Sequence, residues 1–355
     1  MNNNRRLPVY LVIDCSESMA GPAFQAVQSG IQSMLNELRS DPHALETVWL
    51  SVITFSSRAR VVAPLTDVCQ FAPPKLVLGS GTSLGVALDL VEQRMSTEVT
   101  LQTASRKGDW KPIVFLMTDG DPTDTWFKSA DRFYNSISGK KANVIAVACG
   151  PNVNVSNLKR VTKTVLAFKN PAEPSFKEFF KWISQSVQTT SARVARGAQD
   201  GVDLPALPQS MEMAVEGLQV PSQQYVFLLC RCSRTKALYV SRFERVPEEV
   251  LEELRRRRGM TIPRAQEFFA GSGAYPVTDF DWESSKDAMN LSVSSSSLVA
   301  PPACPHCGAK YWAPCGKCER LFCIGGDGNV QCPWCGFMGS YGAATEAFAV
   351  GRGMG

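Results

Sequence analysis

Five oxygen-bearing side chains in the first third of the chain have the types and spacing to hold a hard divalent cation. Asp14, Ser16 and Ser18 stand two apart directly after an apolar run, and alternate side chains of an extended segment point the same way. Thr82 follows a glycine-rich turn, and Asp119 lies in a Thr-Asp-Gly triplet after another apolar run. Such oxygens suit magnesium, or manganese or calcium, better than soft metals. The pattern therefore predicts a magnesium-type site.

The charge of this ligand set indicates what the metal does. Only Asp14 and Asp119 carry a formal negative charge, while the three hydroxyls are neutral. A six-coordinate magnesium ion in such a site keeps waters or an open position and can accept a carboxylate from a partner. The ligand set therefore favours a metal that grips a partner protein over a catalytic one. Cys15 and Glu17 occupy the alternate positions and are expected to face away from the cation.

A second set of residues could bind zinc. Nine of the twelve cysteines lie after residue 229, mostly in CxxC pairs, and without a secretion signal such pairs indicate metal ligation rather than disulfides. Two CxxC turns on neighbouring hairpins form the closed thiolate cage of a structural zinc ribbon. The strand-like runs Leu321 to Ile324 and Asn329 to Gln331 are expected to pair as the hairpin between them. The predicted ligands are Cys315, Cys318, Cys332 and Cys335.

Three further cysteines predict a second zinc site, so one or two zinc ions are expected. They are Cys304, Cys307 and Cys323. Spacing leaves the fourth ligand open among Cys230, Cys232 and His306. It also leaves open an alternative in which Cys304 and Cys307 pair with Cys332 and Cys335. Because the tail is too small to bury much core, metal should supply its folding energy.

The elements that must position the oxygen ligands alternate along residues 7–190. Val9 to Ile13 and Ile113 to Met117 are apolar strand-like runs, whereas residues 24–38 repeat apolar side chains at helical steps. This alternation predicts an α/β fold, a doubly wound, mostly parallel, Rossmann-like sheet covered on both faces. In such folds, sites form at the carboxyl ends of strands where the strand order reverses. The predicted ligands follow strands of this kind.

Composition and the placing of glycine and proline residues divide the chain further. Glycines and prolines over residues 191–215 predict a linker between an N-terminal domain, 1–190, and a C-terminal domain, 216–355, that contains a zinc-binding module at 303–340. The 44% hydrophobic content supports a real core, and a net charge of +4 is too mild to imply a nucleic-acid or membrane partner. The apolar run Leu7 to Ile13 is too short for a secretion signal, and no run reaches the roughly 20 residues of a membrane span. We expect a cytoplasmic protein.

The first ligand set resembles the metal-ion-dependent adhesion site (MIDAS) of von Willebrand factor A (VWA) domains. The matching positions are Asp14-x-Ser16-x-Ser18, Thr82 and Asp119. The resemblance covers roughly residues 7–190. It implies that Ser16, Ser18 and Thr82 coordinate the metal directly and that the two aspartates often act through water.

A VWA domain followed by a cysteine-rich tail resembles the bacterial TerY-like tellurium-resistance family with its TerY-C type zinc-binding domain. That resemblance implies a stress-response system with a Ser/Thr kinase and a metal-dependent protein phosphatase as partners. No residue pattern in the chain indicates tellurite chemistry itself. The favoured function is a non-enzymatic protein-interaction scaffold.

Two other functions compete with the scaffold. Zinc ribbons often bind nucleic acid, and basic and aromatic residues mix in the tail at Lys310, Tyr311, Trp312, Lys317 and Arg320. The same residues would also serve as the packing and rim of a protein interface, so nucleic acid is disfavoured. A metal-dependent phosphohydrolase has less support. His43 and His306 are the only histidines, and no Walker lysine follows the glycine-rich turn.

Overall fold

The computed structural model describes residues 5–103, 107–119, 121–137, 140–150, 153–168, 173–195, 204–214, 224–258, 267–284, 291–342 and 347–352. The chain forms two compact units. Unit 1 consists mainly of Met1–Val220 together with Trp282–Asp287. Unit 2 consists of Pro221–Asp281 and Ala288–Met354. The short stretch Trp282–Asp287 therefore belongs to unit 1 although it lies within the predicted C-terminal domain, 216–355.

Unit 1 is built on a seven-stranded sheet with the order β3-β2-β1-β5-β6-β7-β8. Its strands are β1 (Leu7–Asp14), β2 (Val48–Phe55), β3 (Ala59–Asp67), β5 (Ile113–Thr118), β6 (Asn143–Ala148), β7 (Thr164–Phe168) and β8 (Met211–Met213). All neighbouring pairs are parallel except those made by the edge strands β3 and β8. The predicted mostly parallel α/β sheet is confirmed. The strand order reverses at β1, because β2 lies on one side of it and β5 on the other.

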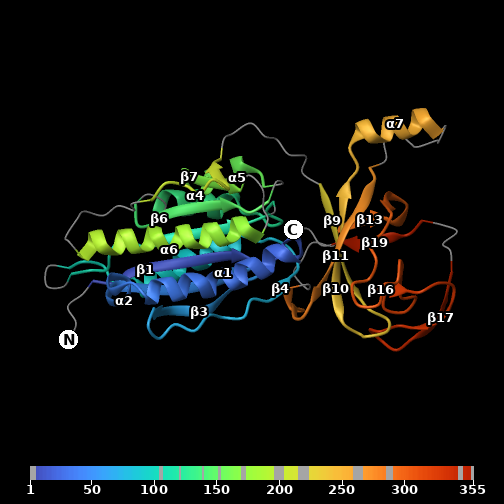
Figure 1. Ribbon diagram of the computed structural model, residues 1–355, viewed down its shortest axis with the longest axis horizontal. Coiled ribbons are helices and arrows are strands. Elements are labelled where there is room, and N and C mark those ends of the chain that lie inside the picture. The colour runs from blue at the N-terminus through green and yellow to red at the C-terminus, as the bar shows by residue number, and fades with distance from the viewer. Residues whose placement is uncertain are drawn as a thin grey trace. The chain divides into compact units, whose positions relative to one another are not determined.

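Helices cover both faces of this sheet. They are α1 (Pro22–Arg39), α2 (Pro42–Thr47), α3 (Leu84–Glu98), α4 (Phe127–Ser136), α5 (Val155–Val161) and α6 (Glu173–Ala195). On one face α1 and α6 run side by side (Figure 1). Trp182 of α6 meets Phe115 of β5 edge to face. On the other face, alternate β1 residues such as Tyr10 and Val12 share a core with α3, α4 and α5. Every β1 residue is consequently buried.

Two elements occupy the predicted linker, residues 191–215. Helix α6 continues through Ala195, and β8 pairs antiparallel with β7, with Phe168 opposite Met211. Trp182 also donates its indole N–H to the Pro205 carbonyl at 3.1 Å. The linker prediction is therefore wrong for these residues. Pro208 precedes a turn at residues 209–210, and that turn leads into β8 of the unit 1 sheet.

Unit 2 contains a six-stranded sheet with the order β14-β11-β10-β9-β16-β15. Its strands are β9 (Tyr225–Arg231), β10 (Leu238–Arg245), β11 (Phe269–Val277), β14 (Leu298–Val299), β15 (Tyr311–Pro314) and β16 (Leu321–Ile324). This half also contains α7 (Glu248–Arg258), β12 (Phe280–Asp281), β13 (Leu291–Ser294), β17 (Gly328–Gln331), β18 (Met338–Tyr341) and β19 (Ala349–Arg352). Strands β9 and β10 pair antiparallel, with Leu238 opposite Arg231.

The hairpin predicted between Leu321 to Ile324 and Asn329 to Gln331 is wrong. Strand β16 instead pairs with β15 and β9, and β17 pairs with β18. The last two CxxC segments each lie on the turn of a hairpin, so the strands that flank one segment pair with each other. Residues 315–320 join β15 to β16, and residues 332–337 join β17 to β18. Among the described residues, no helix is long and apolar enough to cross a membrane.

A close contact between α1 and α6 gives the first prediction. A Cβ placed on Gly30 would lie 2.1 Å from a ring carbon of Phe180. We expect Gly30→Ala to destabilise unit 1 by about 1–3 kcal/mol through overpacking, although alanine is the better helix former by about 1 kcal/mol. Urea unfolding would measure the change, with Gln32→Ala on the exposed side of α1 as control. Unchanged stability would contradict the close packing of the two helices.

Candidate metal centres

The predicted oxygen ligands meet at one edge of the unit 1 sheet. Asp14 is the last residue of β1, and Asp119 directly follows β5. These strands are parallel neighbours, with Ile13 opposite Met117, so both carboxylates lie at the same edge. The Ser18 hydroxyl donates to Asp119 Oδ1 at 2.6 Å, and the Ser16 and Ser18 oxygens are 2.8 Å apart. Hydrogen bonds therefore connect four of the five predicted residues in series: Asp14 to Ser16, Ser16 to Ser18, and Ser18 to Asp119.

Asp14 anchors this loop rather than projecting freely. Its Oδ1 accepts from the Ser16 N–H at 2.9 Å, and its Oδ2 accepts from the Thr118 hydroxyl at 2.6 Å. Asp14 and Ser16 are fully buried. With its oxygens engaged by the protein, Asp14 is suited to orient the serines and to act on a cation through water.

Thr82, the fifth residue, carries a buried hydroxyl without a protein partner. Only 1% of Thr82 is exposed, and its Oγ1 makes no hydrogen bond within the described chain. Buried polar atoms are nearly always satisfied, so this one requires an explanation. Its loop is bonded to the Asp14–Ser18 loop, because Gly79 N–H donates to the Cys15 carbonyl at 2.8 Å. An orphaned hydroxyl beside an oxygen-lined edge fits a cation ligand.

Glu17 has a role at this edge that the sequence did not reveal. Its side chain is buried, and Oε2 accepts from the Gly81 N–H at 3.0 Å. Glu17 therefore links the first ligand loop to the loop that presents Thr82. Burial raises the pKa of Glu17 to about 7. A buried carboxylate bonded to backbone leaves no sequence signature beyond being an acidic residue between two serines.

The electrostatics of the edge favour a cation. Burial raises the pKa of Asp14, although hydrogen bonds from Thr118 and Ser16 oppose the shift. Burial, and then repulsion from Asp14, raise the pKa of Asp119 as well. Two carboxyl groups in a poorly solvated site are costly as neighbouring anions. A divalent cation would remove that cost, which is a further respect in which the residues fit one.

Neighbouring residues outside the ligand set serve the packing and turns around it. Burial raises the pKa of the Cys15 thiol well above its usual value, as for an inert core cysteine. Asp121 accepts from Asn154 N–H at 3.3 Å and acts as a turn residue. Asp124 accepts from Val86 N–H at 3.3 Å, in the first turn of α3, because its loop folds back over that helix.

The four cysteines predicted for the zinc ribbon come together in unit 2. The sulfur atoms of Cys315, Cys318, Cys332 and Cys335 all lie within 4.8 Å of one another. The Cys315–Cys335 and Cys318–Cys332 sulfur separations are 3.7 and 3.8 Å. Zinc–sulfur bonds of about 2.3 Å at tetrahedral angles separate sulfurs by about 3.8 Å. This cluster, which we call cluster B, has the dimensions of a zinc cage.

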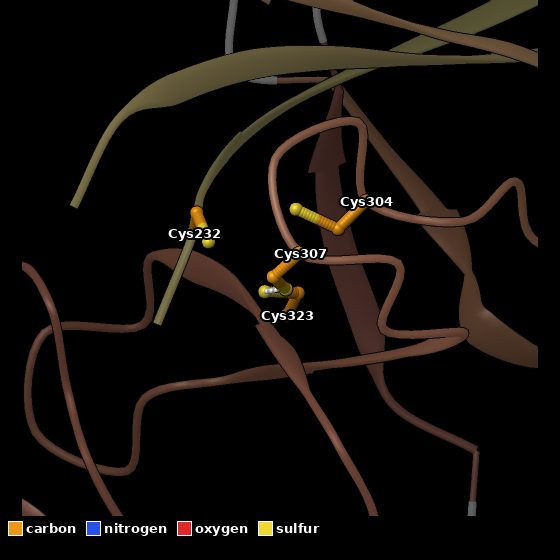
Figure 2. Close-up of side chains that lie close together, drawn as sticks. All are labelled: Cys232, Cys304, Cys307 and Cys323. Atoms are coloured by element: carbon orange, nitrogen blue, oxygen red, sulfur yellow. Dashed lines mark hydrogen bonds between the residues drawn. The ribbon is translucent and has the colours of Figure 1, made fainter. Parts of the chain in front are cut away.

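A second cluster, cluster A, resolves the alternatives for the remaining cysteines. It consists of Cys232, Cys304, Cys307 and Cys323, again within 4.8 Å of one another. Figure 2 shows the four side chains converging: Cys232 follows β9, Cys304 and Cys307 share one turn, and Cys323 lies in β16. The Cys307 and Cys323 sulfurs are 3.5 Å apart. The fourth position left open by the spacing is therefore filled by Cys232.

The other candidates for that position lie elsewhere. Cys230 is buried among core residues, with Tyr239 and Ser241 as hydrogen-bond partners, and burial raises its pKa to about 12. The His306 ring is 2.9 Å from the Leu238 carbonyl oxygen through Nε2. The alternative pairing of Cys304 and Cys307 with the last CxxC pair is wrong, since those pairs belong to different clusters.

One backbone pattern recurs at four turns of unit 2. In each, the N–H of a cysteine donates to the carbonyl five residues later, and the N–H four residues later donates back to that cysteine's carbonyl. The turns begin at Cys232, Cys304, Cys315 and Cys332. Their fifth residues all have positive φ, namely Lys236, Gly308, Glu319 and Gly336. Unit 2 thus contains four zinc-knuckle turns.

The first knuckle lacks its second cysteine. Thr235 stands where the other turns have one, and its N–H lies 3.4 Å from Cys232 Sγ. Cys323, from β16, completes cluster A instead. Although burial acts to raise it, hydrogen bonds from Thr235 lower the pKa of Cys232 to about 6. Backbone hydrogen bonds likewise overcome burial and lower the pKa of Cys315 to about 6. In each cluster one cysteine is thus favoured as a thiolate, the metal-binding form. Burial raises the pKa of Cys304 and Cys307 in cluster A and of Cys318 and Cys332 in cluster B.

Family comparisons agree with both halves. Residues 9–182 match the von Willebrand factor type A domain, so the parallel sheet and its oxygen-lined edge are those of a VWA domain. Residues 222–355 match the TerY-C metal binding domain. The chain belongs to the TerY-like proteins, which join a VWA domain to a TerY-C metal-binding domain. A comparison with curated proteins finds no match.

Solved structures with similarity to the chain cover about half of it. The pilus adhesin SpaC of Lactobacillus rhamnosus GG is 15% identical, with 53% of this chain and 31% of that chain covered and a TM-score of 0.43. Proximal thread matrix protein 1 of the mussel byssus, with a zinc-occupied MIDAS motif, is 15% identical over 54% of this chain and 47% of that chain, with a TM-score of 0.37. This chain thus spans about a third and about half of these proteins.

Proposed function

We propose that this chain is a non-enzymatic scaffold whose VWA domain binds a partner protein through a divalent cation. The observation that carries the proposal is the combination of two carboxylates with three neutral hydroxyls, one of them buried and unpartnered at Thr82. Magnesium, or manganese or calcium in its place, would be held by Ser16, Ser18 and Thr82, with Asp14 and Asp119 acting through water. A cation with so little ligand charge can still accept a partner carboxylate.

The zinc-bearing half has a different role in the proposal. Clusters A and B each offer four sulfurs, the closed coordination of structural zinc, which leaves no open position for catalysis. Two zinc ions would stabilise unit 2 and hold the knuckle turns rigid. Their surface would then present a second docking site.

The proposed partners follow from the family. Membership of the TerY-like proteins suggests a bacterial stress or tellurite-resistance system with a Ser/Thr kinase and a metal-dependent protein phosphatase. We propose a cytoplasmic setting for that assembly. The partner would supply an aspartate or glutamate to the VWA cation, since a carboxylate is the ligand that the cation lacks.

Partner capture with a matched pair of variants tests this function. We expect Asp119→Ala to weaken binding of a kinase or phosphatase partner by at least about tenfold, because residues that hold a metal's ligands or waters in place are commonly worth 10–100-fold. Asp121→Ala, on the same loop but bonded to Asn154, should retain binding. A folded Asp119→Ala protein that binds equally well would contradict the proposal. Chelation alone is a poor test, because it also removes zinc.

Nucleic-acid binding through the tail has less support. Trp312 packs edge to face on Phe348, and Arg320 lies over the Trp334 ring at 5.1 Å. The side chains of Trp312 and Arg320 therefore serve the packing of unit 2. Stacking of a nucleic-acid base would instead require an accessible aromatic face. A salt-dependent gel shift would reveal phosphate contacts and favour this alternative. Lack of turnover of phosphoesters would exclude the phosphohydrolase.

A further inference from the structure

A short segment from the C-terminal part of the sequence is built into the VWA domain. Trp282–Asp287 belongs to unit 1, although the residues before and after it belong to unit 2. Ser284 is completely buried. Its hydroxyl accepts from the Ser80 N–H at 2.7 Å, and its carbonyl accepts from the Ser57 hydroxyl. Ser80 stands two residues before the metal-ligand candidate Thr82.

The loop that contains Ser80 is held entirely by other segments. Each backbone N–H from Gly79 to Ser83 donates to a residue outside the loop. In order, the acceptors are the Cys15 carbonyl, Ser284 Oγ, Glu17 Oε2, Thr123 Oγ1 and the Ser56 carbonyl. Because none of these backbone N–H groups bonds within the loop, the loop depends on the five acceptors for its conformation. Ser284 is the most distant of them in sequence, 204 residues from Ser80.

Three serines close a ring of hydrogen bonds at this point. Ser57 N–H donates to the Ser80 carbonyl at 2.6 Å, and the other two bonds join Ser80 and Ser57 to Ser284. The approach is close, since a Cβ on Gly79 would lie 2.7 Å from Ser284 Oγ. Removing the Ser284 hydroxyl would leave the Ser80 N–H buried without its acceptor. The loop would then gain freedom next to Thr82.

We propose that Ser284 is a positioning residue of the VWA metal site. It holds the Thr82 loop in the conformation that presents the threonine hydroxyl, so cation binding and seating of the 282–284 segment stabilise each other. Such linkage is reciprocal: the free energy by which the seated segment strengthens cation binding equals the free energy by which the cation stabilises seating of the segment. Because the flanking residues belong to unit 2, an event there that withdraws the segment would weaken cation binding. This inference rests on the proposed metal function of unit 1.

Manganese titration of the full chain, followed by electron paramagnetic resonance, tests the inference. We expect Ser284→Ala to weaken Mn²⁺ binding about fivefold or more, the lower range of allosteric couplings. Ser57→Ala, which removes one bond of the ring, should weaken it less. Ser296→Ala, in unit 2, is the control and should bind as the unaltered chain does. Equal affinity of a folded Ser284→Ala protein would overturn the inference.

Hydrogen exchange supplies a readout that does not depend on the variant folding. Adding Mg²⁺ to the unaltered chain should slow exchange in the peptide that contains residues 282–284, and unchanged exchange would overturn the inference. Failure of the underlying metal function is distinguishable. In that case the unaltered chain and Asp119→Ala would bind Mn²⁺ equally, whereas failure of the inference alone leaves those two different.

Discussion

Full-length protein carrying Cys232→Ser should retain one zinc ion in place of two, whereas Cys230→Ser should retain both. The two cysteines are two residues apart and both buried, yet only Cys232 lies in cluster A. Serine is a poor zinc ligand because its hydroxyl is not deprotonated at neutral pH, whereas Cys232 is held as a thiolate. Native mass spectrometry with metal analysis would count the ions. Two ions in the Cys232→Ser protein would contradict the assignment of cluster A.

The same substitution should also loosen unit 2. Apparent binding free energies of structural zinc are about 10–16 kcal/mol, and binding energy becomes folding energy when the unfolded chain has no site. Cluster A joins β9, β16 and the turn before β15, so its loss should expose the sheet to proteolysis. Cluster B lies on the turns of two other hairpin connections and should keep its ion. Cys230→Ser serves as the packing control, because it changes a buried thiol without changing the metal.

Much of the first site could be predicted from the sequence, because its ligands stand next to strands that the local apolar pattern reveals. Asp14 and Asp119 each follow an apolar strand run, and parallel strands carry such residues to one sheet edge. The three-part MIDAS pattern then required only that the alternating elements form the expected sheet. The two CxxC pairs of cluster B were equally local, because each pair lies on the turn of a single hairpin.

The features that sequence reasoning missed depend on partners that carry no pattern. Cys232 starts a knuckle whose second cysteine position is Thr235, so spacing did not distinguish it from Cys230. Strand pairing of β16 and β17 was mispredicted because the knuckle turns, rather than the glycine-rich segment after Ile324, reverse the chain. Ser284 accepts from a backbone N–H, a bond that any distant hydroxyl could make.

Replacing Thr82 by valine should separate metal binding from folding. Valine has nearly the shape of threonine without the hydroxyl, and that hydroxyl has no partner within the described chain. Removing an unsatisfied buried polar atom should leave the metal-free stability of unit 1 unchanged or raise it, since such an atom costs about 1–3 kcal/mol. Mn²⁺ affinity should fall by at least about tenfold, because even outer-shell partners of metals are worth 10–100-fold.

Thr162→Val provides the opposite case. Thr162 is also buried, but its hydroxyl donates to the Val144 carbonyl at 2.7 Å, away from the candidate ligands. That variant should lose about 1 kcal/mol of stability and bind Mn²⁺ normally. Urea unfolding without added divalent metal and Mn²⁺ titration would measure both quantities. If a folded Thr82→Val protein binds Mn²⁺ normally, Thr82 is not a ligand, and its unpartnered hydroxyl can no longer be explained by a cation.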